Sequence, residues 1–391
     1  MTSNALHSSH RSCPICGKKN ANIIYQNDLA ILDNLDMSYG VTVCEDCDFV
    51  YANILPRVEQ YEAYYQGLSK YDVVVDLGSV PAVDQYRAQC AVDFCRPYMK
   101  YDVKIADLGC GSGVLLNAFR QAGWNSLYGL DPAPNAHNKT KEIFSLSDVY
   151  TGTLDQAAEK LPLAEIDLVC LMGVLEHLPM LRENLEGLVR ELPAKVKIMI
   201  EVPALERFCR DEMEPYGEFS LEHIQYFSVK TLIQLMESLG FSPIDISYLE
   251  LPKGSTDSLL CLFGKQVEQK IFLHEQSNIA HYLHQSKTMM DCAMQAITSC
   301  EGKQFIIYGA GSHTARLLPR LQHTGWADKL ICLVDSNTNL HGKSMGGLAI
   351  KSPDALVNYP NVIIIISSFR SQNSIAQALS LKLSNPLLLL Y

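Results

Sequence analysis

Apolar and polar positions alternate in blocks along most of the chain, in a pattern typical of a parallel α/β fold. Short apolar runs of strand length alternate with longer amphipathic segments of helix length. Between residues 83 and 202 the pattern predicts helices at 83–99, 115–122 and 180–192, and strands at 103–108, 126–130, 166–171 and 197–202. This alternation indicates a parallel sheet covered by helices on both faces.

The texture of the sequence divides the chain into three predicted domains. Residues 1–66 are short and polar and contain two Cys-x-x-Cys pairs, which predicts a small N-terminal zinc-binding domain. Residues 67–264 hold the alternating pattern, so we expect a Rossmann-like core there. Residues 265–391 read as a helix over 265–302, followed by strands at 305–308, 330–334 and 362–367. This third region is predicted to be a second, smaller Rossmann-like domain.

Composition and charge narrow the class of protein. The 391 residues are 48% hydrophobic and 19% charged, which is enough apolar material for more than one core. The formal net charge of -11 argues against a nucleic-acid partner, because binding to a phosphate backbone draws on clustered Lys and Arg. The beginning of the chain lacks the pattern of a secretory signal, and no apolar run is long enough to cross a membrane. Most of the thirteen cysteines are scattered, so we expect reduced thiols in a cytoplasmic protein with no membrane partner.

Four cysteines form the predicted metal site. Cys13 and Cys16 make one Cys-x-x-Cys pair, and Cys44 and Cys47 make the other. Two such pairs complete a tetrahedron of thiolates around one zinc ion and leave no open position for a substrate. We therefore predict a structural zinc that stabilises a domain with little core of its own. The alternative interpretation is that these cysteines are redox-active or simply buried.

A glycine-rich turn carries the predicted cofactor pocket. Asp107, Gly109, Gly111 and Gly113 follow an apolar strand and precede a helix, and Asp131 ends the next strand. Glycines let the backbone turn tightly and approach a ligand closely. A strand-end carboxylate at Asp107 favours a cationic methionine group over a pyrophosphate, and one at Asp131 can accept both ribose hydroxyls. The alternative is a dinucleotide site for NAD.

With these residues, the segment 84–264 resembles the class I S-adenosylmethionine-dependent methyltransferases. The resemblance implies that Asp107, Gly109, Gly111 and Gly113 shape the methionine side of the pocket and that Asp131 holds the ribose. It also implies that Gly173, after the predicted strand at 166–171, belongs to the cofactor-binding set.

His177 and the Glu222-His223 pair are the candidates for the reacting side. Glu176-His177 follows the strand at 166–171, where ligands bind in open α/β sheets, although His177 could equally be a residue that orders the loop. Glu222-His223 stands just before a predicted helix for which Ser228 is the expected N-cap. A neighbouring carboxylate raises the pKa of a histidine, so this pair is a hypothetical general base.

The order of cysteine pairs, methyltransferase core, Glu-His-x-x-Tyr-Phe-Ser segment and second Rossmann-like unit resembles the nucleotide-sugar C-methyltransferases of deoxysugar biosynthesis. The resemblance covers essentially the whole chain. It implies C-methylation next to the ketone of a 4-keto deoxyhexose linked to a nucleoside diphosphate. The implied catalytic residues are His223 as general base, Glu222 beside it and His177 near the ketone or enolate, and the implied substrate-binding residues are Tyr64, Tyr65 and Tyr226.

One departure from that family's pattern keeps other acceptors open. The family often has a tyrosine two residues before the Glu-His pair, whereas this chain has Ser220, with Tyr216 or Tyr226 as possible replacements. The alternative function is therefore O- or N-methylation of another small metabolite. A two-Rossmann oxidoreductase and a non-catalytic zinc scaffold are further alternatives. For the turn at Gly309 and Gly311 we weigh diphosphate recognition against a structural or dimer-forming role, and we expect a monomer or a homodimer.

Overall fold

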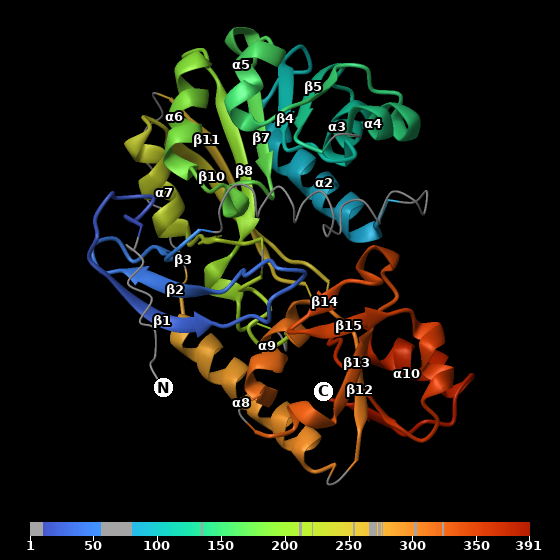
Figure 1. Ribbon diagram of the computed structural model, residues 1–391. Helices are drawn as coiled ribbons and strands as arrows, with labels where there is room; N and C mark the ends of the chain where they lie inside the picture. The colour runs from blue at the N-terminus through green and yellow to red at the C-terminus, as the bar shows by residue number, and fades with distance from the viewer. Residues whose placement is uncertain are drawn as a thin grey trace.

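The computed structural model describes residues 11–55, 80–133, 136–210, 213–220, 222–252, 255–265, 272, 275, 277–300, 303–322 and 324–391. Three sheets organise these residues: a seven-stranded central sheet, a four-stranded N-terminal sheet and a six-stranded C-terminal sheet. The central sheet lies at the top of Figure 1, with the N-terminal sheet below it and the C-terminal sheet at the lower right.

The central sheet has the strand order β10-β11-β8-β7-β4-β5-β6. All neighbouring pairs are parallel except the two that involve β11, which runs antiparallel to β8 and β10. The strands are β4 (Lys104–Leu108), β5 (Ser126–Asp131), β6 (Val149–Thr151), β7 (Leu168–Met172), β8 (Lys197–Pro203), β10 (Ser242–Leu249) and β11 (Ser258–Gly264). This mostly parallel sheet confirms the prediction of a Rossmann-like core.

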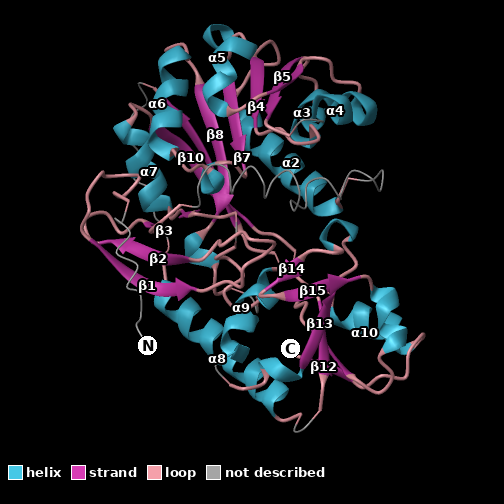
Figure 2. Ribbon diagram, in the orientation of Figure 1, coloured by secondary structure: helices cyan, strands magenta, loops and turns pink. Residues whose placement is uncertain are grey.

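Helices cover both faces of this sheet (Figure 2). They are α2 (Ala82–Cys95), α3 (Val114–Gln121), α4 (Ala136–Phe144), α5 (Ala157–Lys160), α6 (Leu181–Glu191) and α7 (Val229–Ser238). Successive side chains of a strand point to opposite faces, so Leu168 packs with α2 and α3 while Val169 packs with α6 and α7. The helix predicted over 83–99 ends as α2 at Cys95 and continues as a short 3-10 turn that contains Pro97.

The N-terminal sheet contains a strand from far along the chain. Its strands β1 (Ala21–Asn27), β2 (Tyr39–Cys44) and β3 (Val50–Ala52) are antiparallel, and β9 (Gln225–Tyr226) pairs with β3. The predicted domains 1–66 and 67–264 therefore share one sheet. The residues just before β9 include the Glu222-His223 pair.

The C-terminal sheet has the order β14-β15-β13-β12-β16-β17 and is parallel except for β14. Its strands are β12 (Phe305–Tyr308), β13 (Leu330–Val334), β14 (Ser344–Met345), β15 (Leu348–Lys351), β16 (Ile363–Ile366) and β17 (Leu387–Leu389), and its helices are α9 (Ser312–Gln322) and α10 (Gln372–Ser380). α10 packs on one face, and the other face joins a core that also includes the N-terminal sheet. The predicted restart of the strand-helix alternation at residue 305 is confirmed.

The helix predicted over 265–302 is shorter than expected. It is α8 (Ile279–Thr298), which runs from below the N-terminal sheet toward the C-terminal sheet (Figure 1). Asn278 is its N-cap, because the Asn278 side chain accepts a hydrogen bond from the His281 backbone N–H at 3.1 Å. Among the described helices, none is long and apolar enough to cross a membrane.

Candidate functional site

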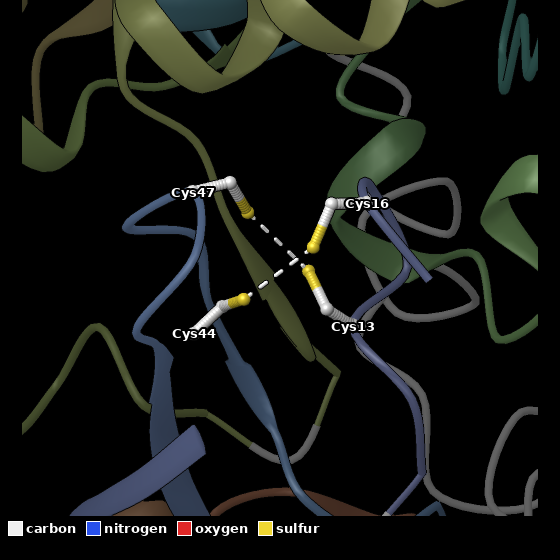
Figure 3. A group of neighbouring side chains, drawn as sticks. All are labelled: Cys13, Cys16, Cys44 and Cys47. Atoms are coloured by element: carbon white, nitrogen blue, oxygen red, sulfur yellow. Dashed lines mark hydrogen bonds between the residues drawn. The ribbon is translucent and has the colours of Figure 1, made fainter. Parts of the chain in front are cut away.

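The four predicted zinc ligands converge, as Figure 3 shows. The Sγ atoms of Cys13 and Cys47 are 3.5 Å apart, as are those of Cys16 and Cys44, and all four lie within 4.8 Å of one another. All four cysteines are free thiols. With Zn–S bonds of 2.3 Å, the sulfurs of a tetrahedral site lie about 3.8 Å apart. The cluster therefore fits a zinc ion.

Two tight turns hold this cluster. Gly17 adopts a φ of 73° after the first pair, and its N–H donates to the carbonyl of Cys13 at 2.9 Å. The positive φ explains why glycine suits this position. The second turn closes where the N–H of Asp48 donates to the carbonyl of Cys44 at 2.9 Å. Cys13, Cys44 and Cys47 are buried in the same core as α6 and α7, so the cluster shares the hydrophobic core on one face of the central sheet.

The glycine-rich turn after β4 has the tight geometry that the sequence predicts. Gly109, Gly111 and Gly113 all have positive φ angles, of 88°, 51° and 82°. A Cβ atom at Gly109 would lie 2.5 Å from Val174 Cγ2, and one at Gly113 would lie 2.4 Å from Thr140 Cγ2. A Cβ atom at Gly111 would meet nothing within 4 Å, so the backbone there is open to a ligand.

Two carboxylates flank this turn. The Asp131 carboxylate accepts the N–H of Gly111 at 2.7 Å and the N–H of Ala133 at 2.9 Å, which fixes its orientation at the end of β5. Asp107 is 2% exposed, and its Oδ1 atom has no hydrogen-bond partner among the described residues. Burial, with a smaller contribution from the nearby Asp131 charge, raises the pKa of Asp107 to about 8. A buried acceptor without a partner fits the cationic methionine portion of S-adenosylmethionine.

Gly173 lies beside a charged cluster that the sequence interpretation missed. A Cβ atom at Gly173 would lie within 4 Å of the side chains of Arg87, Glu176 and Glu201. Glu201 is fully buried and pairs with Arg87, with a distance of 2.6 Å between Oε2 and Nη2. Glu201 interrupts the buried stretch 198–202 of β8, and a charge among buried apolar residues was the signal available in the sequence.

The structure brings the two predicted histidines together. His177 ends a 3-10 turn (Leu175–His177) after β7, and its ring centroid is 4.8 Å from that of His223, in an edge-on arrangement. Three hydrogen bonds join their two backbone segments: the N–H of Ile224 donates to the Glu176 carbonyl, the Gln225 side chain donates to the Leu178 carbonyl, and His177 Nδ1 lies 3.1 Å from the Glu222 carbonyl.

The hydrogen bond to Glu222 fixes the tautomer of His177. A carbonyl oxygen only accepts, so Nδ1 carries the hydrogen and Nε2 carries the lone pair in the neutral ring. Burial lowers the pKa of His177, and the charge of Glu222 partly offsets this effect. The neutral ring is therefore the stable form near pH 7.

Ser220, the departure from the family pattern, shapes the turn that carries His223. Its Oγ atom accepts the N–H of Glu222 at 3.2 Å and the N–H of His223 at 3.0 Å. The Ser220 carbonyl accepts the hydroxyl of Tyr39 at 2.8 Å. Tyr39 lies on β2, and no local pattern in the sequence marks it as part of the site.

The predicted substrate-binding tyrosines have different outcomes. Tyr226 is 2% exposed, and its hydroxyl donates to the His223 carbonyl at 2.8 Å and lies 2.9 Å from the Tyr39 hydroxyl. Contact between Tyr226 and a substrate stays a prediction. Tyr64 and Tyr65 lie outside the described residues. Tyr216 is buried and stacks on Tyr25, with ring centroids 4.2 Å apart.

Comparison with known proteins gives a family match for the segment that forms most of the central sheet. Residues 84–246 match the family described as a methyltransferase domain. This match confirms the prediction of a methyltransferase domain in this segment, and the mostly parallel sheet confirms its Rossmann-like core.

Two curated relatives match part of this chain. A stretch covering 39% of the chain is 27% identical to the C-methyltransferase NovU of Streptomyces niveus, over 36% of that protein. A stretch of similar extent is 28% identical to the tRNA U34 carboxymethyltransferase of Sodalis glossinidius, over 48% of its length. The chain thus matches less than half of the length of either protein.

Solved structures that resemble the chain include a Burkholderia thailandensis 1,6-didemethyltoxoflavin-N1-methyltransferase with bound S-adenosylhomocysteine. It has a TM-score of 0.42 and 16% sequence identity, over 57% of this chain and 98% of that one. The magnesium protoporphyrin IX methyltransferase of Synechocystis PCC 6803 has a TM-score of 0.40 and 15% identity, over 55% of this chain and 100% of that one.

Proposed function

We propose that this protein transfers the methyl group of S-adenosylmethionine to a carbon of a nucleotide-linked 4-keto deoxysugar, through a histidine-assisted enolate. The main support is the His177–His223 pair, which lies at the carboxyl-end loops of the methyltransferase domain with ring centroids 4.8 Å apart. Partial similarity to a C-methyltransferase supports the same reaction class.

The residues of the glycine-rich turn would hold the donor. Bound S-adenosylmethionine would supply a methyl group attached to a positively charged sulfur. Asp107 provides a buried acceptor for the cationic methionine portion, and the open backbone at Gly111 permits close approach of a ligand. Asp131 would accept the ribose hydroxyls, and Gly173 would border the pocket from the end of β7.

The histidine pair would carry out the proton chemistry. His223 is the proposed base that removes a proton from the carbon next to the ketone, a role that contributes roughly 100- to 10,000-fold to the rate of such reactions. His177 is the proposed partner of the ketone oxygen. Burial lowers the pKa of His177 more than the charge of Glu222 raises it, so a proton on Nε2 has to come from a neighbouring group. Tyr226 would act by holding the backbone of His223.

The cysteine cluster would bind a structural zinc. Its four sulfurs leave no position for a substrate, and its burial against the central sheet gives it a role in folding rather than in chemistry. We further propose that the C-terminal sheet encloses part of the acceptor, because α9 contacts the backbone of the loop that carries His223.

Ser220 supports an alternative function, O- or N-methylation of another small metabolite. It replaces a tyrosine of the resembling family, and its hydroxyl is used to bind two backbone N–H groups. A different acceptor would then occupy the space near the histidine pair.

One experiment distinguishes the two reactions. The full-length protein is incubated with methyl-13C-labelled S-adenosylmethionine and a panel of nucleotide-linked 4-keto-6-deoxyhexoses, and the product is analysed by carbon NMR. We expect the label on a ring carbon of the product. In substrate that has not yet been methylated, we expect the hydrogen on that carbon to exchange with solvent deuterium. His223→Gln should slow both exchange and transfer by about 100-fold or more. A label on oxygen or nitrogen, without exchange, would favour the alternative.

A further inference from the structure

Glu176 is a buried carboxyl group for which neither the sequence nor the proposed mechanism gives a role. It is 3% exposed, and its Oε2 atom has no hydrogen-bond partner among the described residues. An unpaired buried carboxylate is costly, because burial removes its hydration without replacing it. Such a group persists in a folded protein when it keeps a proton or meets a ligand.

The position of Glu176 links it to the histidine pair. Its Oε1 atom lies 3.9 Å from Nε2 of His177, and the nearest polar side-chain atoms of Glu176, His177 and His223 all lie within 4.8 Å of one another. The backbone of Glu176 is also tied to this region, since its carbonyl accepts the N–H of Ile224. The carboxyl group thus faces the one ring nitrogen of His177 that carries a lone pair.

The charged groups around Glu176 favour its protonated form. Burial is the largest effect, the neighbouring Glu201 adds to it, and Arg87 opposes it, so that the pKa of Glu176 is raised to about 8. Arg87 is already paired with Glu201 at 2.6 Å, which limits what it gives to a second carboxylate. The titratable groups around Glu176 and His177 come from α2, β8 and the loop before β9. Arg87 and Glu201 act on Glu176, Glu222 acts on His177, and His223 lies close to both.

We propose that Glu176 and His177 share one proton, so that Glu176 acts as a positioning residue that allows His177 to donate a hydrogen bond from Nε2 to the acceptor's oxygen. A neutral His177 with its hydrogen on Nδ1 cannot donate from Nε2. A proton from Glu176 removes this restriction. The separation of 3.9 Å is longer than a hydrogen bond, and such contacts in ligand-free sites often shorten only when a substrate binds.

This inference rests on the proposed C-methylation, and its proton balance is complete. His223 takes the proton from the acceptor carbon, and the electron pair of the broken C–H bond moves toward the carbonyl oxygen. The proton of Glu176 moves to Nε2 of His177, which donates to that oxygen. As the new carbon–carbon bond forms, the bond between methyl and sulfur breaks and its electron pair stays on sulfur. The carbonyl forms again, the shared proton returns to Glu176, and His223 releases its proton to water.

The first test needs no acceptor. Long-range nitrogen–proton NMR spectra of the 15N-histidine-labelled full chain are recorded from pH 5 to 9, with His177 assigned from the spectrum of His177→Asn. We expect the ring nitrogens of His177 to show a step at the pH where the pair loses its proton, and we expect Glu176→Gln to abolish that step. Glu218→Gln is the matched control, because Glu218 is another buried glutamate with a raised pKa, and its carboxylate accepts a hydrogen bond from Thr256. Identical His177 titration in the wild type and Glu176→Gln would overturn the inference.

The second test uses turnover with a dTDP-linked 4-keto-6-deoxyhexose as the acceptor probe. Glu176→Gln should lower kcat about 10- to 100-fold with little change in KM, and it should flatten the alkaline limb of the pH profile. Glu176→Asp should recover part of the loss, because it restores a carboxyl group. If the wild-type protein methylated none of the nucleotide-linked 4-keto-6-deoxyhexoses, the proposed function would be contradicted. The NMR titration would still decide whether Glu176 and His177 share a proton.

Discussion

At the scale of single residues, the methyltransferase domain contains several buried carboxyl groups. Asp107, Glu176 and Glu201 are each at most 3% exposed, and Arg87 is the cation that pairs directly with one of them. Such groups lower the free energy of unfolding when they are buried without full hydrogen bonding. Asp107 and Glu176 are the two for which we propose roles in donor binding and in proton chemistry.

Substitution of Asp107 tests whether this residue lowers folding stability while it strengthens donor binding. Its pKa in the folded protein is about 8, far above the ordinary value of 3.8, so the folded state keeps a proton that the unfolded state releases. Such a group stabilises the fold at low pH, and this contribution is lost as the pH rises toward 8, at up to about 1.4 kcal/mol per pH unit. We therefore expect Asp107→Asn to raise the stability of the donor-free protein at pH 8 more than at pH 5, as measured by chemical denaturation.

The same substitution should weaken donor binding. Loss of a charged acceptor costs about 1.5–3 kcal/mol, which corresponds to roughly 10- to 100-fold in the affinity for S-adenosylmethionine measured by calorimetry. If Asp107→Asn bound the donor as tightly as the wild type, Asp107 would not contact its cationic portion. If its stability did not change with pH relative to the wild type, the group would not be protonated in the fold.

At the scale of elements, the turn before β9 positions His223, and Ser220 holds that turn. Ser220→Ala removes the acceptor for the N–H groups of Glu222 and His223, while Ser220→Thr keeps it. We expect Ser220→Ala to lower kcat about 10-fold because His223 loses its fixed position, and Ser220→Thr to stay near the wild-type value. Donor affinity should stay unchanged in both variants, since the turn does not belong to the glycine-rich segment. Equal turnover by the alanine and threonine variants would show that the two hydrogen bonds do not position the base.

The cysteine cluster is linked to β9, which follows the turn of His223, through the N-terminal sheet. Phe49, two residues after Cys47, packs against Phe227 with ring centroids 5.2 Å apart, and Phe227 directly follows β9. Removal of zinc by a chelator should therefore lower the unfolding temperature and abolish turnover, because the N-terminal sheet that includes β9 would lose its anchor. Metal analysis of the purified protein should give one zinc per chain, and Cys44→Ser should reproduce the effect of the chelator. Full turnover by metal-free protein would exclude this role.

Several parts of this site could be predicted from the sequence, because they depend on the spacing of residues within short segments. The glycine-rich turn, the two aspartates and the cysteine pairs are set by spacing along a short segment, and β12 and β13 have the predicted bounds because each is an apolar run with polar ends. The site residues that the sequence interpretation missed contact residues that are far away in the sequence. Tyr39 binds Ser220, and Arg87 binds Glu201, and neither pair leaves a periodic pattern. β9 is two residues long, which is too short for a pattern to predict.

At the scale of the whole molecule, one arginine connects the C-terminal sheet to the N-terminal sheet and to the segment before β9. Arg316 lies on α9 and is fully buried. Its guanidinium donates to the side chain of Asn27 at the end of β1, to the Phe219 carbonyl, and to Glu214 at 3.4 Å. Phe219 directly precedes Ser220, so the C-terminal sheet reaches the turn of His223 through this side chain. The core around it includes residues of the N-terminal sheet, the segment 205–226 and the C-terminal sheet.

We therefore expect Arg316→Met to damage stability and turnover together. Removal of the guanidinium takes one donor from the Phe219 carbonyl, which keeps Asn27, and one from the Glu214 carboxylate, which keeps Ser312. We expect a cost of about 1.5–3 kcal/mol in the free energy of unfolding. Chemical denaturation of the full chain, followed by circular dichroism and by tryptophan fluorescence, should show one transition at lower denaturant, because the shared core couples the sheets. Under conditions where the variant is still folded, kcat should fall while the affinity for S-adenosylmethionine is retained.

Arg320→Met on the same helix is the matched control. Arg320 donates to the Arg316 carbonyl at 2.7 Å and is only partly buried, so its loss should cost no more than about 1 kcal/mol and should leave kcat unchanged. Equal effects of the two substitutions would mean that the C-terminal sheet acts through general packing. A separate transition for the C-terminal sheet would mean that it folds independently, and the loop of His223 would then depend on the N-terminal sheet for its position.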